Sequence, residues 1–290
     1  MAGLTVRQAI EAATRRLRSA RLAYGHGTFD AREEAAWLVF HACRIPPSDF
    51  GGRMPMPVTP AQKRRIDRLV ERRILERIPA AYLTRQAWLG EHEFYVDRRV
   101  IVPRSFIAEW LPADLSAMLH RPVRSALDMC TGSGCLAILV ALAYRGSRVD
   151  AAELSRPALA VARRNVAAYR LGSRVSLIHS DLFSAVHDRR YDLIVSNPPY
   201  VKERSMTRLP AEYRAEPRMA LVGGPDGLDL VRRILDEARE HLHARGTLVC
   251  EIGHNRKALE RAYPRTPFTW LETSAGDDIV FLIDKESLPG

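Results

Sequence analysis

Over the C-terminal two thirds of the chain, short apolar runs alternate with longer stretches of helical periodicity. The apolar runs have the length of buried strands. Strands alternating with helices predict right-handed crossovers and a mainly parallel sheet, so the fold class is α/β, with a terminal antiparallel hairpin. The predicted strands are Ser125–Met129, Arg148–Glu153, Val175–His179, Tyr191–Ser196, Thr247–Ile252, Leu271–Ser274 and Ile279–Ile283. The predicted helices are Gly134–Ala143, Pro157–Tyr169 and Asp226–His243.

Residues 1–79 are predicted to form a small helical domain. Thr5 with Gln8 makes a capping box, and Thr59 precedes Pro60, a residue favoured at the first helical position. Helical spacing predicts three helices, over residues 5–23, 30–43 and 59–78. The third carries an apolar stripe, and nearly all its arginine and lysine residues are expected on the opposite face. The stripe comprises Ile66, Leu69, Val70, Ile74 and Ile78.

Residues 80–104 are predicted to form a β-hairpin linker before a larger domain over residues 105–290. Three short runs are interrupted by the turn points Gly90 and Asp97. The runs are Ala87–Leu89, Glu93–Val96 and Arg99–Val102. The domain order is therefore helical domain, hairpin linker and α/β domain.

The basic charge is concentrated in the N-terminal third. Residues 1–104 hold 19 basic and 11 acidic residues, whereas residues 105–290 hold 25 and 23. A basic surplus of this kind favours a polyanionic partner such as ribosomal RNA. A solvated arginine-rich helix face is the alternative reading of the same charges.

Several classes of protein are excluded by composition. The chain has 290 residues and is 47% hydrophobic, which argues against wholesale disorder. Its longest apolar stretch, Cys135–Tyr144, is too short to cross a bilayer, and the start has no secretory signal pattern. The four cysteines and nine histidines match no zinc, redox or metal-ligand spacing. We therefore expect a cytoplasmic protein that uses no metal and no membrane.

A glycine-containing loop follows the first predicted strand of the larger domain. It reads Asp128-Met-Cys-Thr131-Gly132-Ser-Gly134 and opens a helix. Glycines allow a ligand close to the backbone. A dinucleotide fingerprint would need a third glycine at position 137, which is Ala137. The preceding carboxylate suits a ligand with hydroxyls or positive charge; the alternative is a plain strand-to-helix turn.

Two further acidic residues end the next two strands. Glu153 lies where a carboxylate can accept hydrogen bonds from both ribose hydroxyls, and Asp181 ends the third strand. Either alone could be a helix cap or a surface acid. Together with Asp128 they converge at one sheet edge, which favours S-adenosylmethionine, because a sulfonium and a ribose suit carboxylates better than phosphates do.

The fourth predicted strand ends in Asn197-Pro198-Pro199-Tyr200. The two prolines stiffen the backbone and supply no N–H donors. The Asn197 side-chain oxygen and the Pro198 carbonyl therefore present acceptors, which match a planar NH₂ group with two donors. Tyr200 can stack on a flat amide or base. A rigid turn without chemistry is the alternative.

This pattern resembles the Rossmann-like class I methyltransferases that modify planar nitrogens through an (Asn/Asp)-Pro-Pro-(Tyr/Phe) motif. The whole chain is most similar to the protein glutamine N5-methyltransferases, which have a helical N-terminal domain and a hairpin linker. Two subgroups act on peptide chain release factors and on large-subunit ribosomal protein L-three. Several segments are similar to the second subgroup: Tyr82-Leu83-Thr84, His92–Val96, Pro103-Arg104-Ser105, Glu212–Pro217 and Gly224–Leu228.

The resemblance implies methyl transfer from S-adenosylmethionine to a glutamine amide nitrogen, with S-adenosylhomocysteine as product. Its substrate is L-three, with ribosomal RNA or assembly intermediates as further partners and release factors as the alternative substrate. The implied catalytic residues are Asn197, Pro198 and Tyr200. Those for the cofactor are Asp128, Thr131, Gly132, Gly134, Glu153, Asp181, Leu182 and Asn197. Those for the substrate are Asn197, Pro198, Pro199, Tyr200, Arg104 and Glu216.

Two other functions remain open from the sequence. A nucleic-acid methyltransferase acting on exocyclic amines uses the same tetrapeptide and would flip its target base. A non-catalytic RNA-binding assembly factor would retain the fold without binding S-adenosylmethionine. The basic surplus lies far in sequence from the tetrapeptide, which argues against the first, and the intact 128–134 loop argues against the second.

Overall fold

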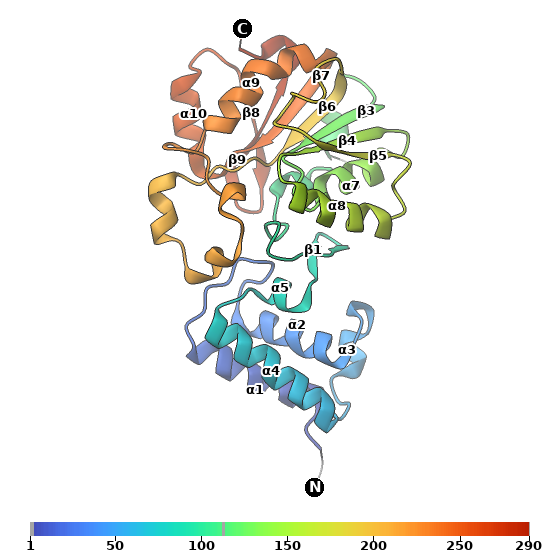
Figure 1. Ribbon diagram of the computed structural model, residues 1–290, viewed down its shortest axis with the longest axis vertical. Helices are drawn as coiled ribbons and strands as arrows, with labels where there is room; N and C mark the ends of the chain where they lie inside the picture. Colours follow the sequence, from blue (N-terminus) through green and yellow to red (C-terminus); the bar gives the residue numbers. More distant parts are fainter. Residues whose placement is uncertain (1–2, 112–113, 290) are drawn as a thin grey trace. The chain divides into compact units, whose positions relative to one another are not determined.

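The computed structural model describes residues 3–111 and 114–289. The chain divides into two compact units (Figure 1). The first contains the residues up to Ala87 together with Pro210–Ala215, and the second contains Trp88–Leu209 and the residues from Glu216 onward. The segment Pro210–Ala215 therefore belongs to the first unit, although the residues on both sides of it in the sequence belong to the second.

The first unit is a helical bundle whose helix starts match the sequence signals. Thr5 and Thr59 each form a capping box with the glutamine three residues on. Asp30 caps the second helix by accepting from two backbone N–H groups. The first helix ends at Ser19, earlier than predicted. The helices are α1 (Val6–Ser19), α2 (Ala31–Cys43), α3 (Phe50–Arg53), α4 (Pro60–Glu76) and α5 (Ala80–Thr84).

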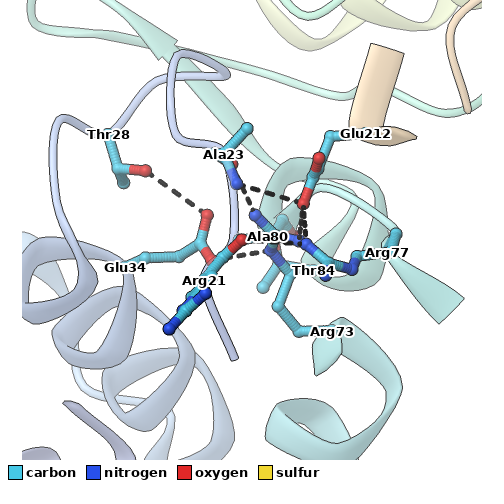
Figure 2. A network of polar contacts seen from close by, with 9 residues as sticks. All are labelled: Arg21, Ala23, Thr28, Glu34, Arg73, Arg77, Ala80, Thr84 and Glu212. Carbon is cyan, nitrogen blue, oxygen red and sulfur yellow. Dashed lines mark hydrogen bonds and ion pairs between the residues drawn. The ribbon is translucent and has the colours of Figure 1, made fainter. Parts of the chain in front are cut away.

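One arginine of α4 corrects the prediction that its cations avoid the apolar face. Ile66 and Val70 are buried as predicted, but Arg73 is also buried on this side and is only 1% exposed. Its guanidinium contacts Glu34 of α2, at 2.7 Å, and Glu212 of the Pro210–Ala215 segment, at 3.2 Å (Figure 2). The interior of this unit therefore contains a paired charge cluster as well as apolar residues.

The second unit is built on a seven-stranded sheet of order β5-β4-β3-β6-β7-β9-β8. Strands β5 to β7 run parallel, and β9 pairs antiparallel with β7 and β8, which confirms the predicted terminal hairpin. The strands are β3 (Ser125–Met129), β4 (Arg148–Glu153), β5 (Val175–His179), β6 (Tyr191–Ser196), β7 (Leu242–Glu251), β8 (Thr269–Thr273) and β9 (Gly276–Asp284). The helices are α6 (Asp114–Met118), α7 (Cys135–Ala143), α8 (Arg156–Ala168), α9 (Asp229–His241) and α10 (Arg256–Ala262).

Both faces of this sheet are covered. Within β6, Leu193 and Val195 contribute to one apolar cluster, whereas Ile194 contributes to the other. Helix α7 contributes to the first cluster and α9 to the second, on opposite faces of the sheet (Figure 1). Burial on two faces explains why the central strands read as continuous apolar runs.

The β-hairpin of the linker is shorter than the sequence predicts. It forms the two-stranded hairpin β1 (Ala87–Leu89) and β2 (His92–Phe94). The prediction of a third strand over Arg99–Val102 is wrong, because this segment forms a turn in which Val100 N–H donates to the Asp97 carbonyl. Among the described residues, we find no helix that is long and apolar enough to span a membrane.

Candidate functional site

A cavity lies where the parallel strands of the second unit end. Its empty volume, open solvent included, is about 720 Å³. Residues after β3, β4, β5 and β6 line it together, as expected at the carboxyl edge of a doubly wound sheet. The predicted residues on its wall are Gly132, Glu153, Asp181, Leu182, Asn197 and Pro199.

The glycine loop lies against this cavity, and its shape depends on left-handed backbone. Gly132 and Gly134 have φ values of 55° and 81°. A Cβ on Gly134 would come within 3.2 Å of the Ala162 Cβ, a tight contact, and the left-handed φ would strain any other residue there. Cys130 also adopts a positive φ, 61°, and it lines the cavity.

Asp128 does not lie on the cavity wall. Its Oδ2 accepts hydrogen bonds from the Thr131 hydroxyl and from the Ala137 N–H at 2.8 Å, at the start of α7. The side chain is fully buried, and this burial raises the pKa of Asp128 to about 7. Asp128 and Thr131 therefore hold the loop against the start of α7. They do not face the cavity, contrary to what the strand-end pattern suggested.

Glu153 lies on the cavity wall at the end of β4. Its Oε2 accepts from the Gly132 N–H at 2.9 Å, and its Oε1 accepts from the Ser155 N–H at 2.8 Å. Each carboxylate oxygen keeps a further lone pair for a ligand hydroxyl. The same side chain thus orders the glycine loop and offers acceptors to the cavity.

Asp181 and Leu182 form the next part of the wall. Asp181 is half exposed and pairs with Arg233 of α9 at 3.1 Å, so part of its charge is already balanced. Leu182 is buried, has a positive φ of 47° and presents an apolar surface to the cavity. The sequence contained no signal for Arg233, because α9 is more than 40 residues further along the chain.

The tetrapeptide forms the corner of the cavity after β6. Asn197 and Pro199 line the wall, whereas Pro198 is buried, and neither it nor Tyr200 is among the lining residues. Within residues 3–111 and 114–289, neither the Asn197 carboxamide nor the Pro198 carbonyl makes a hydrogen bond. Acceptors without internal partners beside a cavity are suited to a ligand with N–H donors.

Arg104 and Glu216, which the sequence suggests as contacts for the substrate peptide, form an ion pair with each other. Two guanidinium nitrogens of Arg104 donate to the two Glu216 oxygens, at 2.6 and 2.8 Å. Glu216 Oε1 also accepts from the Val102 N–H at 2.9 Å. This bidentate pair joins the segment before the α/β sheet to the loop that follows the tetrapeptide.

Sequence reasoning missed several residues of the site. Leu154, Met219 and Leu230 give the cavity apolar walls. Leu154 and Met219 are more than half exposed, so part of this apolar wall is open to solvent. Met219 and Leu230 come from the loop and helix after the tetrapeptide, so no local motif indicates them.

The chemistry of this wall fits S-adenosylmethionine better than a phosphate ligand. Apolar side chains suit an adenine ring, Glu153 suits ribose hydroxyls, and the carboxylates favour a cation. The wall presents Arg99 as its only basic side chain among the described residues. In this described part of the chain, no group of three or more His, Cys, Asp or Glu side chains is arranged to hold a metal ion.

Two family models match the chain. The model described as "Methyltransferase small domain" matches residues 111–213. The model described as "PrmC N-terminal domain" matches residues 8–84. The two matches cover different parts of the chain, and they follow each other in sequence.

Curated relatives match over nearly the whole length. The ribosomal protein uL3 glutamine methyltransferase of Bordetella pertussis is 50% identical over 286 residues, covering 98% of this chain and 96% of that protein. The protein of the same name from Neisseria meningitidis serogroup A is 49% identical over 288 residues, covering 99% and 95%.

Among solved structures, the chain is similar to the hMettl16 catalytic domain crystallised with the MAT2A 3′UTR hairpin 6. The TM-score is 0.50 at 17% identity, and the match covers 65% of this chain and 73% of that one. At this identity the likeness shows a shared methyltransferase fold, in agreement with the predicted α/β class.

Proposed function

The chain belongs to the family of ribosomal protein uL3 glutamine methyltransferases, and we propose that it methylates the side-chain amide nitrogen (N5) of a glutamine in uL3 (ribosomal protein L-three). The methyl donor is S-adenosylmethionine and the product is S-adenosylhomocysteine. The reaction is expected in the cytoplasm, with the basic helical unit available to ribosomal RNA or assembly intermediates.

One observation carries this proposal. The corner borders a cavity through Asn197 and Pro199, and neither the Asn197 carboxamide nor the Pro198 carbonyl has an internal partner in the described part of the chain. A primary amide has two N–H donors in one plane, and it can satisfy both acceptors at once. Few other uncharged groups of a protein present that pair of donors.

The cofactor is assigned to the cavity wall. Glu153 holds the ribose hydroxyls, Leu182 and the neighbouring apolar residues contact the adenine, and Gly132 permits close approach to the backbone. Asp128, Thr131 and Gly134 act indirectly, because they set the shape of the loop. When bound, S-adenosylmethionine supplies an electrophilic methyl group on a sulfonium.

The chain's own contribution is mainly positioning. An amide nitrogen is a poor nucleophile because its lone pair is delocalised into the carbonyl. Asn197 and the Pro198 carbonyl hold the two amide hydrogens, and Tyr200 packs against the amide plane. Such placement is worth about 7–11 kcal/mol in favourable cases. The same acceptors stabilise positive charge that develops on the nitrogen, which then loses a proton to water.

The decisive experiment compares possible acceptors directly. Purified protein is incubated with methyl-labelled S-adenosylmethionine and, separately, uL3, each release factor and ribosomal RNA, followed by mass mapping of the labelled residue. Label on one glutamine of uL3 supports the proposal. Label only on a release factor would show that release factors, not uL3, are the substrate. Label in RNA would show that the protein methylates bases instead of glutamine.

A further inference from the structure

The hydroxyl of Tyr200 has a buried partner that no sequence motif indicates. It donates a hydrogen bond to Oε1 of Glu251 at 2.9 Å. Glu251 is the last residue of β7 and its exposed fraction is 0%. A buried carboxylate is stable only if hydrogen-bond donors compensate its charge. The residues that supply these donors are therefore the ones that Glu251 holds in place.

The other oxygen of Glu251 binds a different segment. Oε2 accepts from the Ser105 hydroxyl at 2.7 Å and from the Phe106 N–H at 2.9 Å. Burial raises the pKa of Glu251, and these donors, Tyr200 and the charge of Arg104 oppose that rise. The carboxylate thus joins the turn at Ser105 to the tetrapeptide, and both belong to the second unit.

The rest of Tyr200 is held by the residues that follow Glu251. Gly253 has a φ of 53°, and a Cβ there would lie 2.7 Å from the ring Cε2 of Tyr200. The side chain of Asn255 donates to the Tyr200 carbonyl at 2.9 Å. The end of β7 therefore fixes the hydroxyl, the ring face and the backbone of this one tyrosine.

We propose that Glu251 is a positioning residue for methyl transfer, acting through Tyr200. This inference rests on the proposed function, in which the Tyr200 ring packs against the substrate amide. The carboxylate accepts a hydrogen bond from the tyrosine hydroxyl and so fixes the direction and depth of the ring in the corner, while Gly253 lies against the ring itself. Ser105 and the Phe106 N–H hold the carboxylate in turn, so that the ring has one orientation before the substrate arrives.

Glu251 also has a matched control within the same sheet. Asp192 of β6 is buried, accepts from the N–H groups of Arg124 and Ser125 and from the Ser125 hydroxyl, and pairs with Arg121 at 2.7 Å. Asp192 lies near the amino end of its strand, whereas the cavity lies beyond the carboxyl end. Asp192→Asn therefore reports the general cost of removing a buried carboxylate from this sheet.

The test is a double-mutant cycle on kcat with Glu251→Gln and Tyr200→Phe. Each single variant is expected to lower kcat for uL3 by about 10- to 100-fold, with KM for S-adenosylmethionine within about twofold of the parent. The double variant is expected to be no slower than the slower single variant, because Glu251 acts only through the tyrosine hydroxyl. Asp192→Asn is expected to lower the melting temperature without this change in kcat.

Multiplicative loss in the double variant, or an equal loss of kcat in Asp192→Asn, would overturn the inference. If Glu251→Gln does not fold, Ser105→Ala replaces it in the cycle, because it removes one donor to the same carboxylate. The variant Asn197→Ala distinguishes failure of the proposed function from failure of the proposed role of Glu251. Full uL3 methylation in that variant would refute the corner mechanism itself, whereas an inactive Asn197→Ala with a multiplicative cycle would refute only the role of Glu251.

Discussion

Arg73 and Glu212 are 139 residues apart in sequence, and their side chains, each 1% exposed, form a buried ion pair at 3.2 Å (Figure 2). Arg77 donates to the same Glu212 oxygen at 3.1 Å, and the Ala23 N–H does so at 3.2 Å. The loop after the Asn197–Tyr200 tetrapeptide thus places one of its carboxylates inside the helical unit. The stability of that unit depends on residues from both regions of the sequence.

Replacing Arg73 by Met is predicted to destabilise the helical unit by about 3–5 kcal/mol, because Glu34 and Glu212 would lose their buried partner. Urea unfolding followed by circular dichroism measures the change. The control is Arg72→Met, since Arg72 is 46% exposed and pairs with Glu76 on the surface. That variant is expected to change stability by less than about 1 kcal/mol. Equal effects of the two substitutions would contradict the role of Arg73.

Asn197→Ala is predicted to retain cofactor binding and to lower kcat by about 100- to 1,000-fold, because an acceptor for the amide hydrogens is removed. Calorimetry with S-adenosylhomocysteine and steady-state rates with uL3 measure the two quantities. Asn197→Asp keeps acceptor oxygens and is expected to lose less activity than Asn197→Ala. The same rate in the alanine variant and the parent would exclude Asn197 from catalysis.

Glu153→Gln is predicted to weaken S-adenosylhomocysteine binding by about 10- to 100-fold. The substituted amide places an NH₂ group where the Gly132 or Ser155 N–H and a ribose hydroxyl need an acceptor. Titration calorimetry measures the dissociation constant. Asp188→Asn is the control, because Asp188 is 88% exposed and does not line the cavity. An unchanged constant in Glu153→Gln would remove Glu153 from the cofactor site.

Asp128 predicts a pH dependence of stability. Its pKa rises from about 3.8 unfolded to about 7 in the fold because the carboxyl is buried. The stabilisation is therefore complete below pH 4 and is lost as the pH rises through 7, since the buried group must ionise. The loss between pH 5 and pH 8 is roughly 2–3 kcal/mol.

Asp128→Asn has no such ionisation, so its unfolding free energy is expected to vary less over that range. Urea unfolding without cofactor at both pH values measures the difference between the parent and the variant. Parallel pH profiles for the two proteins would show that Asp128 does not titrate in this range.

The strands could be predicted from the sequence because the patterns that indicate them involve only neighbouring residues. β3, β4, β5 and β6 have the predicted bounds. The central strands β3 and β6 are buried along almost their whole length, and their sequences are accordingly rich in apolar residues. Glu153 and Asn197 meet at one cavity because parallel strands bring their carboxyl ends to the same edge. The sequence also indicated the family, because the tetrapeptide and the glycine loop are contiguous motifs.

The direction and partners of single side chains were not predictable in the same way. Asp128 turns beneath its loop toward Ala137, and Arg73 joins the apolar face of α4 because Glu34 and Glu212 compensate its charge. Glu251 carries no motif, yet its strand ends beside Tyr200.

The sequence alone determined the alternating elements, the strand-end acids and the stiff proline corner, because each depends on neighbours along the chain. Only the tertiary structure decided which carboxylates face the cavity and which are buried with donors from distant segments. The physical reason is that a buried charge is stable only where specific partners converge on it, and their convergence depends on the packing of the entire unit.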